Sequence, residues 1–409
     1  MLVLWIISCV LFAILFSKRI QIQILTSISL WILMPATAGV ILTGVPLIGS
    51  SLPSIHPATY LIVVCFIIQA LLGHISLSQV NISFILIHTL FVLIASVVSL
   101  LGGDGQSLGL IADTLIPGFC IFWLSRAAIR KSDTFKTNFT RTLLSLAIVE
   151  CFLSILQFYS HSTLIYSSYF SRYQYWYHAE YIERANGTLD HPLVLGTLLA
   201  ATIPLCASLS RKSARYLAMT LLLFGILASG SRASLILGIV VSIYSLRYES
   251  KKLLTGLLIA VTGGLFLYFS ANFSLLQNSL VRFATDGGSS DYRVMALKKY
   301  GEIMWQYTFI GGGLGKSGEV TFSQGIGSLE NGYLIWAIDI GLLATAVLFF
   351  WQIHESVARK GHKDAFGLSA LVIILQSCTF SSFATRSVIL VLLYSVLGMR
   401  NVDKSHIVT

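Results

Sequence analysis

Apolar runs of about membrane-span length follow one another along nearly the whole chain, with short polar connections between them. A helix that satisfies its own backbone groups needs roughly 20 mostly apolar residues to cross a bilayer. Only 11% of the 409 residues are charged and 56% are hydrophobic, whereas soluble domains carry about 25% charged residues. This balance excludes a soluble globular enzyme and a disordered protein. We therefore predict an all-α polytopic membrane protein, with residues 1–409 forming a single transmembrane domain.

The apolar runs predict about 12–13 transmembrane helices. No basic residue precedes the first run, so we interpret residues 2–17 as a retained span and not as a signal peptide. The thirteen candidate spans are 2–17, 20–42, 58–73, 82–101, 108–124, 143–158, 193–209, 216–228, 233–246, 253–270, 333–352, 365–383 and 386–399.

Positive charge alternates between successive connections, with 18 Lys and Arg residues in one set and nine in the other. Cytoplasmic loops are enriched in Lys and Arg, so we expect the richer set inside. This topology accounts for the net charge of +10 without a nucleic acid partner. The C-terminus is then inside, and an odd number of spans places the N-terminus outside. Two long connections, 159–192 and 271–332, fall on the outer side, where we expect function.

The first outer loop, 159–192, is rich in aromatic side chains. It holds seven of the 17 tyrosines and the consecutive residues Tyr175, Trp176 and Tyr177. Such side chains gather at membrane interfaces, and their flat apolar faces with a hydrogen-bonding tip also suit carbohydrate. The composition leaves both interpretations open.

Two arginines lie close to the outer ends of predicted spans. Arg184 lies shortly before Asp190-His191-Pro192, and Arg232 opens a short span after a Gly-Ser turn. A guanidinium is the side chain that best matches phosphate, and an arginine at the membrane face needs an anion or carboxylate. The structural alternatives are a helix capped by Asp190 with Pro192 in its first turn, and an Arg232 that reaches for the interface.

The second outer loop, 271–332, contains a glycine-rich turn. The run Ile310–Ser317 looks like a nucleotide-binding P-loop, but an isoleucine stands where that motif needs its first glycine. The N–H groups of Gly313 and Gly315 hold an anion in one interpretation, and the turn is only a flexible loop in the other. Asp339, an ionisable residue within the next apolar run, is a further candidate functional group.

The order of these motifs resembles a known family. An arginine and His-Pro precede one span, and Gly-Ser-Arg-Ala-Ser-Leu opens another. An arginine in the large outer loop, a Gly-Gly-Leu-Gly turn and Asn-x-Tyr-Leu follow, with an acid and a glycine beyond. Over roughly 184–345 the chain resembles the O-antigen ligase and Wzy-type O-antigen (exopolysaccharide) polymerase family of bacterial membrane proteins. The resemblance implies a membrane-embedded, GT-C-like glycosyltransferase bundle in the bacterial cytoplasmic (inner) membrane. Its large outer loop would cap an active site that faces the periplasm or exterior.

The resemblance also implies roles for single residues. The family joins glycans carried on a polyprenyl diphosphate. Arg184, Arg232 and Arg293 match positions expected to face the diphosphate or the glycan. Asn331 and Tyr333 match the segment that follows the large loop, and both are expected to bind substrate.

One departure from the family pattern concerns the general base. Ligases typically have a histidine immediately before that asparagine, and here Glu330 occupies the position. This favours a polymerase of lipid-linked repeat units, with Glu330 as the base and His191 as the other candidate proton acceptor. An O-antigen ligase, which transfers the glycan to a lipid A core or similar acceptor, is the alternative.

The expected reaction needs no metal and no cofactor. A sugar on a diphosphate is already activated, and the outer loops hold no Asp-x-Asp pair or histidine cluster that would demand a metal. The expected partners are the lipid-linked glycan, the bilayer, and a chain-length regulator and flippase of the same pathway. A lipid-linked glycan flippase or transporter is the rival from another class, and it predicts substrate-lining charges near mid-bilayer. Most outer cations lie in loops or at span ends, which favours an enzyme.

Overall fold

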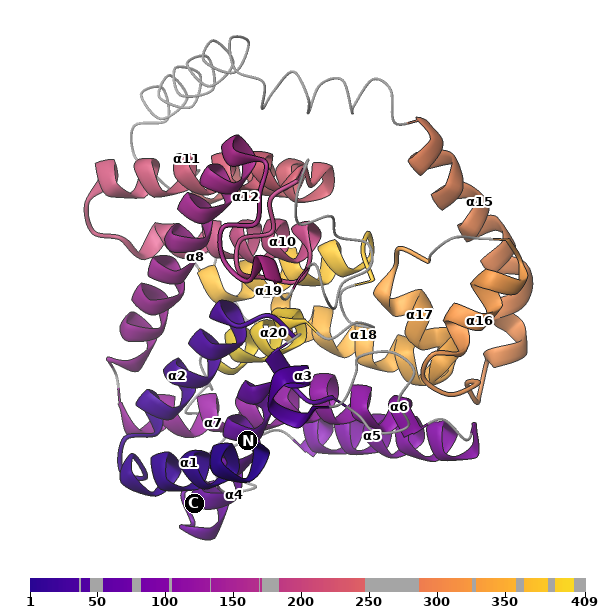
Figure 1. The fold of residues 1–409 in the computed structure, drawn as a ribbon, viewed down its shortest axis with the longest axis horizontal. Helices are drawn as coiled ribbons and strands as arrows, with labels where there is room; N and C mark the ends of the chain where they lie inside the picture. The colour runs from indigo at the N-terminus through magenta and orange to yellow at the C-terminus, as the bar shows by residue number, and fades with distance from the viewer. Residues whose placement is uncertain are drawn as a thin grey trace.

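The structure is a computed structural model, and every secondary-structure element in its described part is helical (Figure 1). It describes residues 1–36, 38–44, 54–75, 82–102, 105–132, 134–168, 170, 184–246, 287–325, 329–357, 364–381 and 387–400.

Three of these helices are long and apolar enough to cross a membrane. They are α5 (Ile82–Leu101), the helix Leu108–Lys131 and α8 (Phe135–Ser160). The helix Leu108–Lys131 comprises the end of α6 (Gly105–Leu110), the π-helix η2 (Ile111–Leu115) and α7 (Ile116–Lys131). The shorter apolar helices are α1 (Leu2–Leu15), α2 (Ile20–Leu33), α4 (Pro57–Leu71), α10 (Pro192–Thr202) with η3 (Ile203–Ser208), α12 (Arg232–Leu246), α18 (Leu342–Val357), α19 (Ala365–Ser377) and α20 (Val388–Gly398). The others are α3 (Ala38–Thr43), α11 (Lys212–Ser229), α15 (Gly287–Ile303), η4 (Met304–Tyr307), α16 (Lys316–Ser323) and α17 (Gly332–Asp339).

Helices occupy every predicted span that falls within the described residues; the span 253–270 lies outside them. The predicted span 82–101 coincides with α5. The predicted span 20–42 is divided into α2 and α3 near Pro35, because proline lacks the N–H group that would continue the helix. The outer connection 271–332, predicted as a loop, contains the helices α15, η4 and α16.

The predicted span 333–352 is not one helix but a hairpin. In a continuous helix Tyr333 and Phe349 would stand about 24 Å apart. Their ring centroids are instead 4.7 Å apart, and the Tyr333 hydroxyl reaches Gln352. The chain reverses at Gly341, whose φ of +127° suits glycine. The start of α17 therefore lies beside the middle of α18, about 15 Å along α18 from its first residue.

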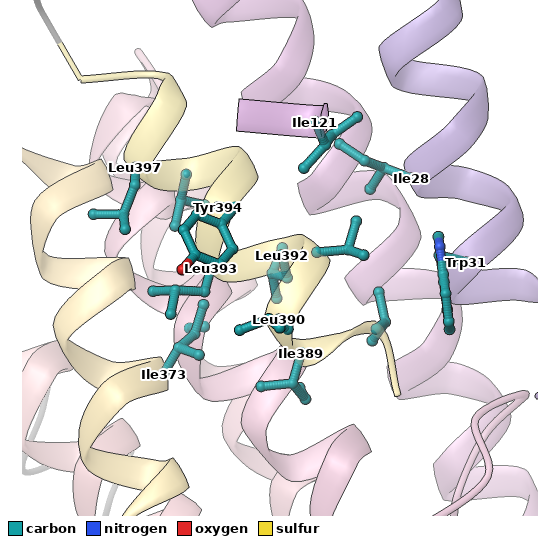
Figure 2. Packing of buried hydrophobic residues seen from close by; sticks show 14 of the residues in the cluster. Ile28, Trp31, Ile121, Ile373, Ile389, Leu390, Leu392, Leu393, Tyr394 and Leu397 are labelled. Atoms are coloured by element: carbon teal, nitrogen blue, oxygen red, sulfur yellow. The ribbon is translucent and has the colours of Figure 1, made fainter. Parts of the chain in front are cut away.

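The core of the bundle is built around α20. All 11 residues of this helix are buried, as expected for a helix that is apolar on every side. Figure 2 shows its leucines and Tyr394 among Ile373 of α19, Ile121 of α7 and Ile28 of α2. The helices that carry the candidate site thus surround one common core.

At one end of the bundle, buried arginines tie connections that were predicted to be cytoplasmic. Arg126, near the end of α7, donates to the carbonyl oxygen of Arg400 at 2.7 Å and lies 3.9 Å from the Glu355 carboxylate. Arg400 in turn pairs with Asp364, which precedes α19. The arginines thereby compensate carbonyl groups left unpaired at a helix end.

At the other end, contacts join the predicted outer loop 159–192 to the second half of the predicted span 20–42. The Asp190 carboxylate accepts the N–H of Ala36 at 2.6 Å, and the Tyr166 hydroxyl donates to Leu33 O at 3.0 Å. In Figure 1, the turn between α1 and α2 lies at the left edge, and α15 and α16 lie at the right edge. The assignment of the connections to the two sides of a membrane stays a prediction.

Candidate functional site

Two polar residues of α8 hold the loop that carries Arg184. Gln157 accepts the N–H of Gly187 at 2.8 Å and donates to its carbonyl oxygen at 2.7 Å. Glu150 accepts both the N–H and the hydroxyl of Thr188. Gly187 has φ +63°, and a Cβ there would lie 2.0 Å from Glu150 Oε2. Sequence reasoning did not single out Gln157, although its spacing of seven from Glu150 places both on one helix face.

The loop brings two predicted arginines to one turn. The Nε–H group of Arg184 donates to Ser229 O at 3.0 Å, and its side chain lies against Gly230, which ends α11. Arg232 begins α12 two residues later. In the sequence, α10, η3 and α11 separate Arg184 from Arg232. In the fold, both residues lie at the turn of Gly230.

His191 lies at the start of α10 and is held as a neutral ring. Its Nδ1 atom accepts the N–H of Leu193 at 3.1 Å, so His191 is the N-cap. Asp190, the predicted cap, binds Ala36 instead. Burial, and secondly the positive charge of Arg184, lower the pKa of His191 from 6.5 to about 4. The neutral ring therefore carries its proton on Nε2, where it is a hydrogen-bond donor.

Phe380, which follows α19, connects His191 to the start of α17. The Phe380 and His191 rings stack with centroids 5.0 Å apart, and Phe380 O accepts the N–H of Gly332 at 3.2 Å. Asn331 caps α17 by accepting the N–H groups two and three residues ahead, each at 3.1 Å. Glu330 is half-buried beside this cap and is not itself the cap. Sequence reasoning missed Phe380, because one phenylalanine in an apolar run carries no local signal.

Tyr333 points into the bundle and starts a chain of hydrogen bonds. Its hydroxyl donates to Gln352 Oε1 at 2.6 Å, and Gln352 Nε2 donates to the Tyr394 hydroxyl oxygen at 3.3 Å. Tyr394 donates to His88 Nε2 at 2.5 Å, and His88 Nδ1 donates to Phe84 O at 2.8 Å. Every donor in this chain faces an acceptor. The chain therefore requires the His88 tautomer that carries its proton on Nδ1. The predicted substrate contact of Tyr333 thus has its hydroxyl engaged in the core, where it orients α17.

The glycine-rich turn encloses the end of α17. The N–H groups of Gly311–Gly313 donate to the carbonyl oxygens of residues 338–340. The Asp339 carboxylate accepts the N–H of Gly315 at 3.1 Å and of Ser317 at 2.7 Å. These contacts cap the end of α17 and the beginning of α16. The donors of Gly313 and Gly315, proposed to hold an anion, and the Asp339 carboxylate therefore already have partners within the protein.

The remaining predicted residues are described only partly or not at all. Arg293 lies on α15, but its side chain is outside the described part of the structure, as are Tyr175, Trp176 and Tyr177 entirely. Within the described ranges, no group of three or more His, Cys, Asp or Glu side chains could hold a metal ion.

A series of contacts therefore links four segments. The loop of Arg184 and His191 contacts the Gly230 turn before Arg232, and His191 stacks on Phe380, which binds the backbone at the start of α17 beside Glu330. Comparison with protein-family models, with curated proteins and with solved structures finds no match for this chain. The functional argument consequently depends on the geometry of these residues and on the order of the motifs.

Proposed function

We propose that the protein polymerises oligosaccharide repeat units carried on a polyprenyl diphosphate, on the outer face of a bacterial cytoplasmic membrane. The observation that carries this proposal is the series of contacts that links the segments of two arginines to the segment of a carboxylate far away in the sequence. Arg184 and Arg232 share one turn, and Phe380 links the adjoining His191 to the segment of Glu330. Cations for a diphosphate and a base for a hydroxyl are what such a transfer requires.

In the proposed reaction, an acceptor hydroxyl oxygen attacks the anomeric carbon of the donor sugar. The bond from that carbon to the diphosphate oxygen breaks, and polyprenyl diphosphate leaves with the electron pair. The hydroxyl proton passes to the Glu330 carboxylate. Arg184 and Arg232 stabilise the negative charge that builds up on the diphosphate.

The geometry gives His191 a role different from that of a base. Its Nδ1 lone pair accepts a backbone N–H group, and its low pKa keeps the ring neutral. We therefore assign proton acceptance to Glu330, with the Nε2–H group of His191 as a hydrogen-bond donor to the substrate.

The proposal is tested with purified protein in phosphatidylcholine vesicles that contain a polyprenyl-diphosphate-linked oligosaccharide. A polymerase lengthens the glycan without a second acceptor, and the Glu330→Gln variant does not. Transfer that requires an added lipid A core acceptor indicates a ligase. Passage of the lipid-linked glycan between leaflets without covalent change indicates a flippase and contradicts the proposal.

A strain that lacks the protein separates the same alternatives in the cell. Single repeat units that still reach the surface, without polymer, support the polymerase. Polymer that accumulates on the lipid carrier supports the ligase.

A further inference from the structure

The segment formed by α15, η4 and residues 308–310 exposes several large apolar side chains. Trp305, Phe309 and Ile310 are 66%, 76% and 66% exposed, and Val294 and Leu297 are also exposed. Monomeric proteins seldom leave such side chains together in water without an interaction partner.

Other residues of α15 attach the segment to the bundle. Ala296 and Tyr300 are buried, and Tyr300 packs with Leu329, Ile335 and Ile338 at α17. The exposed apolar residues therefore do not hold the segment in place.

The exposed residues lie where two apolar stripes end. Thr308 O accepts the N–H of Leu343, the first exposed residue of an apolar stripe on α18 that continues through Val347 and Phe350. The glycine-rich turn reaches α5, where Leu314 N–H donates to Ser99. In Figure 1, α15, α16 and α17 lie together at the right edge, next to α18. The exposed stripe of α5 runs at helical spacing over its whole length: Ile82, Leu86, Leu90, Leu93, Val97 and Leu100.

We propose that this segment lies in the bilayer leaflet at this end of the bundle, with Phe309 and Ile310 among the acyl chains and Trp305 at the headgroup boundary. The stripes on α5 and α18 are the surfaces that a span presents to lipid, and Phe309 adjoins the α18 stripe. Tryptophan prefers the interface. Because α15 also packs on α17, the bilayer surface then helps to fix the helix that begins at Asn331. This inference does not depend on the proposed function.

The test measures what surrounds single labels. The Phe309→Cys variant, with Ile310→Cys as a second position, carries an environment-sensitive fluorophore in phosphatidylcholine nanodiscs. Glu302→Cys, an exposed polar position of α15, is the matched control. Unsubstituted protein, in which five of the six cysteines are buried, gives the labelling background. We expect lipids brominated on their acyl chains to remove most emission at 309 and 310 and little at 302, and aqueous iodide to do the reverse.

Two results would overturn the inference. Quenching by iodide but not by brominated lipid at 309 and 310 places the segment in water. Protection of both labels from both quenchers means that protein covers them, and a second copy of the chain is then the first candidate.

Discussion

Arg184 and Arg232 should tolerate lysine poorly if they hold a diphosphate. Lysine keeps the charge but loses the planar fork that binds two oxygens at once. Loss of a charge-assisted hydrogen bond costs about 1.5–3 kcal/mol, or roughly one to two orders of magnitude in rate. Glycan elongation by each Arg→Lys variant should fall by that factor with short and long donors alike. Arg141→Lys, at an exposed position of α8, is the control. Full activity in the double variant would mean that the arginines supply only a diffuse positive field.

Glu330 is the residue on which the proposed proton transfer depends. Glu330→Gln removes the base while keeping the size of the side chain, so it should express normally and lose most turnover. Glu330→Asp should be intermediate. The variant should unfold like the wild type, because Asn331 provides the helix cap. Glu302→Gln on α15 is the matched control. Wild-type specific activity in Glu330→Gln would exclude this carboxylate as the base.

His191 should make stability depend on pH. Its folded pKa of about 4 lies below the ordinary 6.5, so between these values the unfolded chain binds a proton that the folded site does not. The contribution of His191 is therefore complete above pH 6.5 and is lost as the pH falls towards 4. Replacement by asparagine keeps a good N-cap and should flatten this part of the unfolding free energy curve. Thermal unfolding in detergent across the range measures it, and equal slopes in both proteins would contradict it.

Among the elements, the hairpin of α17 and α18 is the one that hydropathy could not predict. Residues 333–352 form a continuous apolar run, and only Asp339 and Gly341 interrupt its pattern. The reversal depends on a turn more than 20 residues upstream, whose N–H groups cap α17. By contrast, α5 was predicted to the residue, since its length and composition are properties of one segment. The contact of His191 with Phe380 likewise joins residues that are far apart in the sequence, so no local sequence pattern predicts it.

Gly311 tests how the turn encloses α17. A Cβ at this position would lie 2.3 Å from the Asp339 carbonyl and 2.4 Å from the backbone nitrogen of Ile340. Backbone atoms cannot rotate away, so Gly311→Ala should destabilise the protein by about 1–3 kcal/mol. Gly318→Ala is the control, because nothing lies within 4 Å of its added methyl group. Alanine within α16 should be neutral or stabilise by up to about 1 kcal/mol. Equal unfolding temperatures for the two variants would contradict the close approach.

For the whole molecule, the central prediction is its sidedness. Ser323 on α16 and Ser213 on α11 are both exposed, and the 18-to-9 division of cations places them on opposite sides. An impermeant maleimide applied to spheroplasts should label Ser323→Cys directly and Ser213→Cys only after permeabilisation. The reverse pattern would put the candidate site on the cytoplasmic side and remove the proposed function.

The described part of the molecule agrees with the sequence in helix class, because the length and hydropathy of each run report this property directly. The site is different. Arg184, Arg232, His191 and Glu330 were chosen from short motifs, but their arrangement depends on Gln157, Phe380 and Gly187. These supporting residues show their roles only in the folded chain.

The hairpin has a consequence for how the protein is made. The membrane insertion machinery meets 333–352 as one run long enough for a single crossing. A straight helix and the hairpin leave all later spans with the same orientation. In both forms the chain crosses the membrane once between residues 333 and 357, because α17 does not cross it separately. The straight form, however, would leave Glu330 at the membrane surface. The movement of Asn331 to the middle of α18 would then be a folding step that follows insertion. A newly inserted chain would therefore reach its final topology before its candidate site is assembled.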